Sequence, residues 1–142
     1  MSFNYALRFT VFIFAVAVHY AHTKGDDLYH AVCLGLVCSS IVRHWCAFVT
    51  PAVALIDRVA AHLCYALCAY THLVEVPSYC GVACLAGVLG LWICEHRMED
   101  WARAHALLHV VGFVGIMLAV EARASDFDIA ADFDIKAVGA DK

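Results

Sequence analysis

The sequence predicts an all-α integral membrane bundle of about five transmembrane helices. Apolar residues make up 64% of the 142 residues and charged residues only 15%, which leaves too little polar surface to coat a soluble globule. The apolar residues gather in stretches long enough to cross a bilayer. Because hydrocarbon offers backbone amides no water, such stretches must form helices. The chain is therefore expected to be a multi-pass membrane protein.

The first apolar stretch, residues 3–20, has two possible interpretations. Arg8 near its start and the small residues of Ala15-Val16-Ala17 are typical of a cleavable signal peptide. The same stretch also suits a first transmembrane helix of marginal length. We favour the retained helix, which precedes a polar loop that contains Lys24.

Proline marks the boundary between the second and third predicted helices. The second helix covers residues 28–45 and ends at Arg43 and His44. Proline suits the first turn of a helix and disfavours helix in the residue before it, so Thr50-Pro51 predicts a turn. The third helix is expected at residues 52–73.

Glycines and a polar cluster define the last two predicted helices. The fourth helix, residues 79–94, is rich in glycine, which permits close contact between helices. The polar cluster at residues 95–100 then interrupts the apolar pattern. The fifth helix is expected at residues 101–120, with Trp101 at the membrane interface.

The C-terminal residues differ in composition from the rest of the chain. The domains predicted are a bundle of residues 1–121 and an acidic soluble tail of residues 122–142, disordered or lying on the surface. Most of the net charge of −4 comes from this tail. The charge therefore describes a solvated appendage, and no nucleic-acid partner is implied.

The eight cysteines all lie in or beside apolar stretches, where small hydrophobic residues are the simplest interpretation. Cys64 and Cys68 lie before the connection between the third and fourth predicted helices, and Cys80 and Cys84 lie after it. The two cysteines of each pair are four residues apart. A metal or disulfide clasp could use that spacing.

Basic residues predict the orientation of the bundle. The second and fourth loops contain or border four arginines, whereas the other side has few basic residues outside the acidic tail; the four are Arg43, Arg58, Arg97 and Arg103. Because cytoplasmic loops are enriched in basic residues, these two loops are expected in the cytoplasm.

Polar residues on three predicted helices meet near that cytoplasmic face. His105 and His109 are four residues apart and share a helix face, so both can bind one cation, and His44 offers a third nitrogen. Three nitrogen ligands and a water form the open site of catalytic zinc, in which the metal lowers the water pKa to about 7. Asp57 would orient or deprotonate that water. Ser40, one turn before His44, would support a ligand or donate a hydrogen bond to a substrate carbonyl.

These residues resemble the CREST superfamily of membrane proteins, which includes alkaline ceramidases and the adiponectin and progestin receptor group with its hemolysin III relatives. That superfamily has SxxxH on one helix, aspartate on the next and HxxxH on the last. Ser40 and His44 form the first motif here, Asp57 follows, and His105 and His109 form the last. The resemblance implies a zinc-dependent hydrolase that acts on a lipid amide or ester in the bilayer.

The resemblance covers residues 28–120, although the family typically has seven transmembrane helices and this chain five at most. Two alternative functions remain open. One is a haem-binding electron-transfer or anchor subunit, for which His62 and His109 would be the natural axial pair. The other is a non-enzymatic membrane bundle, with Asp57 and Arg58 lining a polar path. The simplest role of Asp57 by itself is an ion pair with Arg43, Arg58 or Arg97.

Overall fold

The computed structural model describes residues 9–45, 50–95, 97 and 101–139, with the side chains of the last helix described as far as residue 126. These residues are all-helical, as predicted. The elements in chain order are α2 (Ile13–Thr23), α3 (Asp27–Trp45), α4 (Pro51–Tyr70), the π-helix η1 (Thr71–Glu75), α5 (Tyr79–Glu95) and α6 (Trp101–Gly139).

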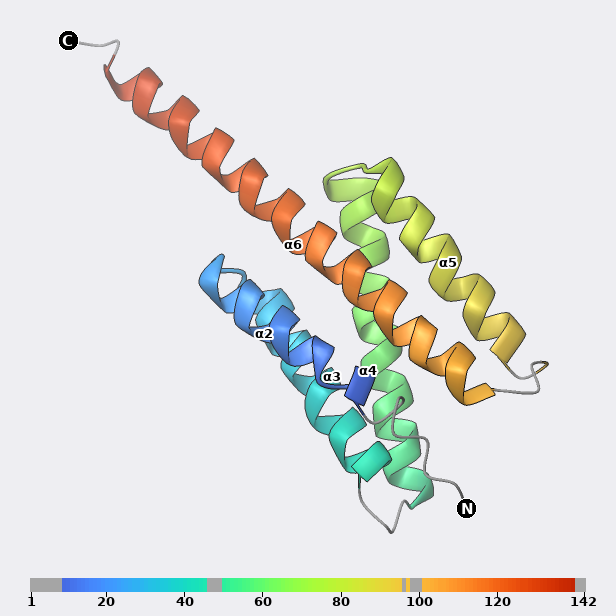
Figure 1. Cartoon of the computed structure of the whole chain (residues 1–142). Coiled ribbons are helices and arrows are strands. Elements are labelled where there is room, and N and C mark those ends of the chain that lie inside the picture. The colour runs from blue at the N-terminus through green and yellow to red at the C-terminus, as the bar shows by residue number, and fades with distance from the viewer. Residues whose placement is uncertain (1–8, 46–49, 96, 98–100, 140–142) are drawn as a thin grey trace.

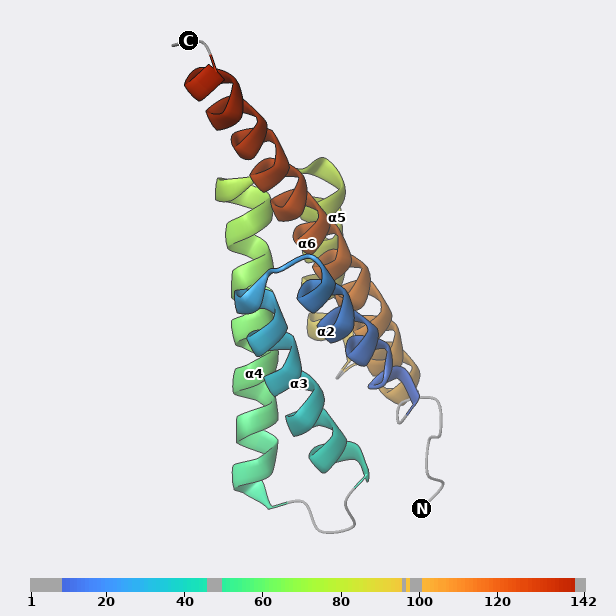
Figure 2. The same cartoon turned by 90° about the vertical axis from the view of Figure 1, so that its left-hand side faces the viewer.

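The helices form one bundle around α6, the long helix that crosses Figure 1 diagonally. α5 lies along the first half of α6, and α2 packs against both α3 and α6. Figure 2 shows α4 and α3 side by side, with α5 and α6 across from them. The C-terminal part of α6 extends beyond the other helices in both views.

The predicted starts of four helices are correct to within one residue, and a capping side chain explains three of them, at α3, α4 and α5. Thr50 precedes α4, and its Oγ1 accepts a hydrogen bond from the Val53 amide at 3.3 Å. Pro51 takes the first helical position, where its missing N–H costs nothing. At the start of α5, Ser78 Oγ accepts from the Gly81 amide at 3.2 Å.

The turn between α2 and α3 depends on Gly25, whose φ of 71° lies in the left-handed region that glycine adopts without strain. Asp26 then caps α3, because its Oδ1 accepts a hydrogen bond from the Tyr29 amide at 3.0 Å. Phe14 and Ala17 of α2 are buried in the bundle. Residues 3–8 of the first apolar stretch lie outside the described residues, and the choice between signal peptide and retained helix stays a prediction.

The last helix is longer than the sequence indicates. α6 continues past residue 120 to Gly139, through the acidic segment that we expected to be disordered or to lie on the surface. Residues 121–138 contain no glycine or proline and five alanines, so nothing in them terminates a helix. The division into a bundle of residues 1–121 and a soluble tail stays a prediction.

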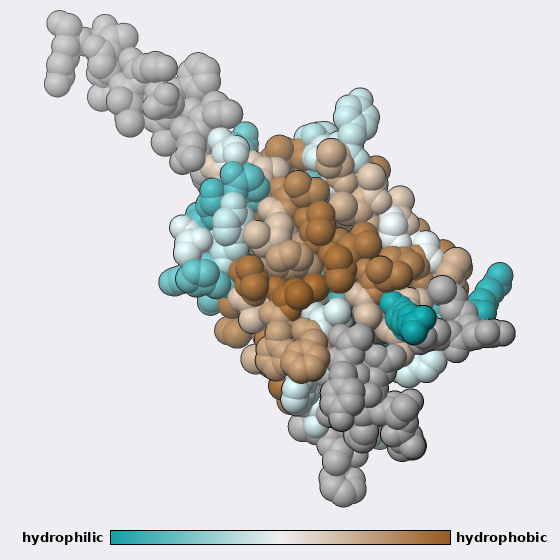
Figure 3. Space-filling view, viewed as in Figure 1, coloured by the Kyte–Doolittle hydropathy of each residue, from teal (hydrophilic) through white to brown (hydrophobic). Residues whose placement is uncertain are grey.

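Two helical segments of the described chain are long and apolar enough to cross a membrane, Pro51–Glu75 and Trp101–Asp126. α5 is apolar but shorter. Apolar side chains gather across the middle of the face in Figure 3, with polar residues toward its edges. The predicted count of about five transmembrane helices exceeds these two segments.

The described cysteines are free thiols, including all four residues of the predicted clasp. Cys64 and Cys68 lie in the core, with exposed fractions of 3% and 5%. They pack as small hydrophobic residues, which was the simpler of the two interpretations. Cys46 lies outside the described residues.

Candidate metal centre

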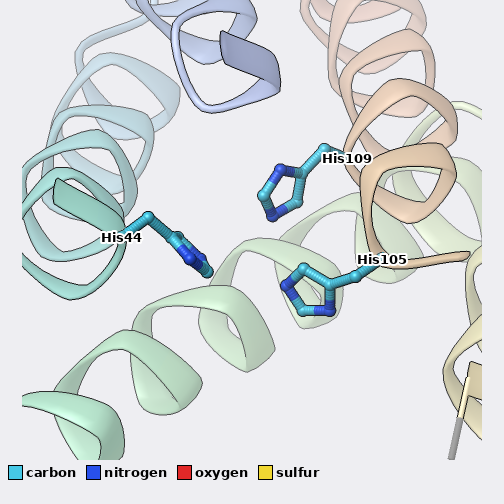
Figure 4. Close-up of side chains that lie close together, drawn as sticks. All are labelled: His44, His105 and His109. Carbon is cyan, nitrogen blue, oxygen red and sulfur yellow. The ribbon is translucent and has the colours of Figure 1, made fainter. Parts of the chain in front are cut away.

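Three histidine side chains converge between α3 and α6, as Figure 4 shows. His44 comes from the last turn of α3, and His105 and His109 come from the first turns of α6. One ring nitrogen from each histidine lies within 4.8 Å of the other two. The ring centroids are 4.8 Å apart for His105 and His109, and 5.8 Å from His44 to each of them. The structure therefore brings together the three predicted metal ligands; that they bind a metal stays a prediction.

Helix packing explains how residues so distant in sequence meet. The four-residue spacing of His105 and His109 places both rings on one face of α6, where neighbours lie about 5–6 Å apart. α2 and α4 each pack against both α3 and α6, and they hold the end of α3 beside the start of α6. His44 faces the paired histidines because of this arrangement.

Two oxygen atoms orient the paired histidines. His109 Nδ1 lies 3.0 Å from Thr10 Oγ1, and His105 Nδ1 lies 2.8 Å from Glu95 Oε2. When Nδ1 carries the hydrogen and donates it to these oxygens, Nε2 keeps its lone pair for a cation. Sequence reasoning missed both partners. Glu95 did offer a signal, because it ends the fourth apolar stretch on the side where the fifth begins.

Asp57 is the centre of a second polar group beside the histidines. Its Oδ1 accepts hydrogen bonds from Ser40 at 2.5 Å and from Ser39 at 3.3 Å, and its Oδ2 accepts one from Arg43 Nη1 at 2.7 Å. Asp57 and Ser40 are 5% and 3% exposed. The carboxylate is thus paired with Arg43, the first of the ion-pair partners considered from the sequence. Ser40 and Arg43 hold it in one orientation, whereas the Ser39 hydroxyl also lies 3.1 Å from the Leu36 carbonyl oxygen.

A cavity of about 400 Å³ connects the two polar groups to the apolar interior. Ser40, Asp57, His105 and His109 line it together with Glu95. Most of the remaining lining is apolar and comes from α4, α5 and α6, with Leu85, Val88, Leu108 and Ile116 among its members. An apolar cavity with a few convergent polar groups is the usual form of a small-molecule site.

Aromatic rings cover two of the histidines. Phe14 of α2 meets His109 edge to face, with ring centroids 5.5 Å apart, and Trp101 meets His105 in the same way at 6.2 Å. Such contacts fill the space around the imidazoles and fix their planes. They also reduce the room for water on those sides.

Two histidines outside the cluster, His62 and His72, make packing and main-chain contacts. His62 is exposed, its Nδ1 lies 2.6 Å from the Arg58 carbonyl of the same helix, and its ring packs on Trp92. His72 is 1% exposed, and its Nε2 lies 3.1 Å from the Gly115 carbonyl oxygen. His96 lies outside the described residues.

No protein-family model, curated protein or solved structure matches this chain. The class of this protein is therefore described from its fold and its candidate site. The described residues form an all-helical bundle with two helices apolar enough for a membrane and a group of three histidines that could hold a metal ion.

Proposed function

We propose that this protein is a multi-pass integral membrane hydrolase, dependent on zinc and similar to the CREST superfamily, that acts on a lipid amide or ester. The observation that carries the proposal is the convergence of His44, His105 and His109 on one point beside the buried pair of Ser40 and Asp57. All five residues of the sequence motifs gather at one end of the bundle.

The surface of α4 supports the membrane assignment. A core helix of a soluble protein is as apolar as a membrane helix but is mostly buried, whereas only 17% of the apolar window in Pro51–Glu75 is buried. Leu55, Ile56 and Leu63 are 62%, 60% and 59% exposed. A large exposed apolar surface of this kind fits lipid better than water. With α4 and α6 in the bilayer, the neighbouring α2, α3 and α5 become the remaining transmembrane helices.

The donor set of the three histidines suits zinc. Imidazole nitrogen is a common zinc ligand, and three of them leave a fourth position for water or substrate. Nitrogens around a tetrahedral zinc ion lie about 3.4 Å apart. The three nitrogens in this chain lie within 4.8 Å of one another, so rotations of the side chains can close the triangle.

Different residues of the site would have different roles in the hydrolysis. Bound zinc would act as a Lewis acid on the substrate carbonyl and would lower the pKa of a water. Asp57 has both oxygens engaged by Ser40, Ser39 and Arg43, an arrangement that suits orienting neighbouring groups better than taking up a proton. Arg43 supplies positive charge at the polar end of the cavity, where a substrate oxyanion would develop.

The cavity supports a lipid substrate. Its apolar walls from α4, α5 and α6 suit an acyl chain, and its polar end presents His105, His109 and Ser40 to the head of that chain. The haem alternative has less support, because His62 is exposed and its ring packs on Trp92, whereas His109 packs beside His44 and His105. A zinc centre instead uses both histidines of the pair on α6.

Hydrolysis by purified protein tests this proposal. Detergent-solubilised protein, loaded with zinc or stripped by a chelator, is incubated with long-chain fatty amides and esters, and release of free fatty acid is measured. We expect release only from the zinc-loaded form and its loss in Asp57→Asn. Metal-loaded, folded protein that releases no fatty acid from either class would refute the hydrolase and favour the non-enzymatic bundle.

A further inference from the structure

Glu95 occupies a position that is unfavourable for a carboxylate. It is the last residue of α5, where the helix dipole disfavours negative charge, and it is only 6% exposed. A buried acid costs free energy unless it is paired or hydrogen-bonded. A buried acid at the C-terminal end of a helix and at the wall of a cavity therefore indicates a functional constraint on its partner.

One of the three clustered histidines is a partner of Glu95. Oε2 of Glu95 lies 2.8 Å from Nδ1 of His105, and both side chains are largely buried, with exposed fractions of 7% and 16%. His109 has a different partner, the neutral hydroxyl of Thr10. The two histidines of one helix are therefore held by groups of unequal charge.

We infer that Glu95 is a positioning residue of the metal centre, which fixes the tautomer of His105 and raises the basicity of its Nε2. This inference rests on the proposed zinc site and adds a residue to it. A carboxylate that accepts the Nδ1 hydrogen directs Nε2 toward the ion and strengthens its bond to the metal. Thr10 orients His109 in the same way without the added charge, so Glu95 has the larger effect on affinity.

The test compares metal affinity and folding in full-length, detergent-solubilised protein. The affinity for Zn²⁺ is measured by competition with a chelator, and the absorption spectrum of bound Co²⁺ reports the ligand geometry. Glu95→Leu removes the acceptor, whereas Glu95→Gln keeps an acceptor oxygen without the charge. Glu75→Gln is the matched control, because Glu75 pairs with Arg123 at the other end of the bundle.

We expect Glu95→Leu to weaken Zn²⁺ binding by about 10- to 100-fold and to alter the Co²⁺ spectrum. Glu95→Gln should recover part of that loss, and Glu75→Gln should bind as the wild type does. The metal-free Leu variant should unfold within a few degrees of the wild type, since it loses a buried charge as well as a hydrogen bond.

Two results would overturn the inference, and they differ from each other. Unchanged affinity and spectrum in Glu95→Leu, with a wild type that binds zinc, would leave the zinc site standing and remove Glu95 from it. A wild type that binds neither metal would refute the zinc site itself and the role of Glu95 with it.

Discussion

The hydroxyl of Ser40 on α3 donates a 2.5 Å hydrogen bond to Oδ1 of Asp57 on α4, and both residues are buried. The bond joins the two helices at the cavity that His105 and His109 also line. It links the SxxxH motif to the aspartate that follows it in sequence. Residues that were chosen as candidates for chemistry thus also hold two helices together.

Removal of that hydroxyl should lower stability. A buried hydrogen bond to a charged group contributes about 1.5–3 kcal/mol, so Ser40→Ala should lower the free energy of unfolding by that amount. Equilibrium unfolding in detergent measures the change. Ser125→Ala, which removes a bond to the carbonyl of its own helix, is the control and should stay within about 0.5 kcal/mol of the wild type. Equal effects of the two substitutions would contradict a special role for the Ser40 bond.

Substitution of Arg43 should lower the rate of turnover and leave the metal content of the protein unchanged. Arg43→Gln removes the cation that holds Oδ2 of Asp57, so the carboxylate loses its fixed orientation. Loss of orientation at a reacting centre costs about 10²-fold in rate. Steady-state hydrolysis and metal analysis of the same preparation separate the two quantities. Lys24→Gln, which removes an exposed cation paired with Glu121, should leave both unchanged. Full turnover in Arg43→Gln would show that Asp57 needs no such partner.

Alanine substitutions at two glycines should change the stability of the protein in opposite directions. A Cβ on Gly81 would collide with the imidazole ring of His72, so Gly81→Ala should destabilise the protein by about 1–3 kcal/mol through overpacking. A Cβ on Gly35 in α3 meets no atom within 4 Å. Gly35→Ala should therefore stabilise the helix by about 0.5–1 kcal/mol. Thermal unfolding of both variants checks the contrast, and the same sign for both would refute this packing of His72.

A charged substitution on the outer face of α4 tests whether that face contacts lipid or water. Leu63 is 59% exposed, and an aspartate in the middle of a membrane helix costs about 2.5–3.5 kcal/mol. Leu63→Asp should reduce the share of protein that resists alkaline carbonate extraction from membranes, whereas Leu63→Ala should not. If Leu63→Asp instead yields folded protein without detergent, α4 faces water.

Much of the helical framework could be predicted from sequence because its signals are local. Thr50-Pro51 and the polar cluster after residue 94 mark helix boundaries through capping and hydropathy alone. The histidine pair on α6 follows from a spacing of four residues. The extension of α6 to Gly139 was missed, because an acidic composition outweighed helix propensity in the interpretation of the tail.

The partners of the site residues could not be predicted in the same way. Thr10 and His109 are 99 residues apart in sequence, and Thr10 reaches His109 because it lies just before α2, which packs against α6. The pairing of Glu95 with His105 depends likewise on how α5 lies along α6. The candidate ligands follow from spacing within helices, whereas the groups that orient them follow from contacts between helices.

Zinc content of purified protein tests the central claim most directly. The wild type is compared with the double variant His105→Ala/His109→Ala and with His19→Ala/His22→Ala, which removes two histidines from α2. We expect about one zinc ion per chain in the wild type and in the α2 variant, and none in the α6 variant. Equal zinc in the wild type and the α6 variant would contradict a metal centre at the three histidines.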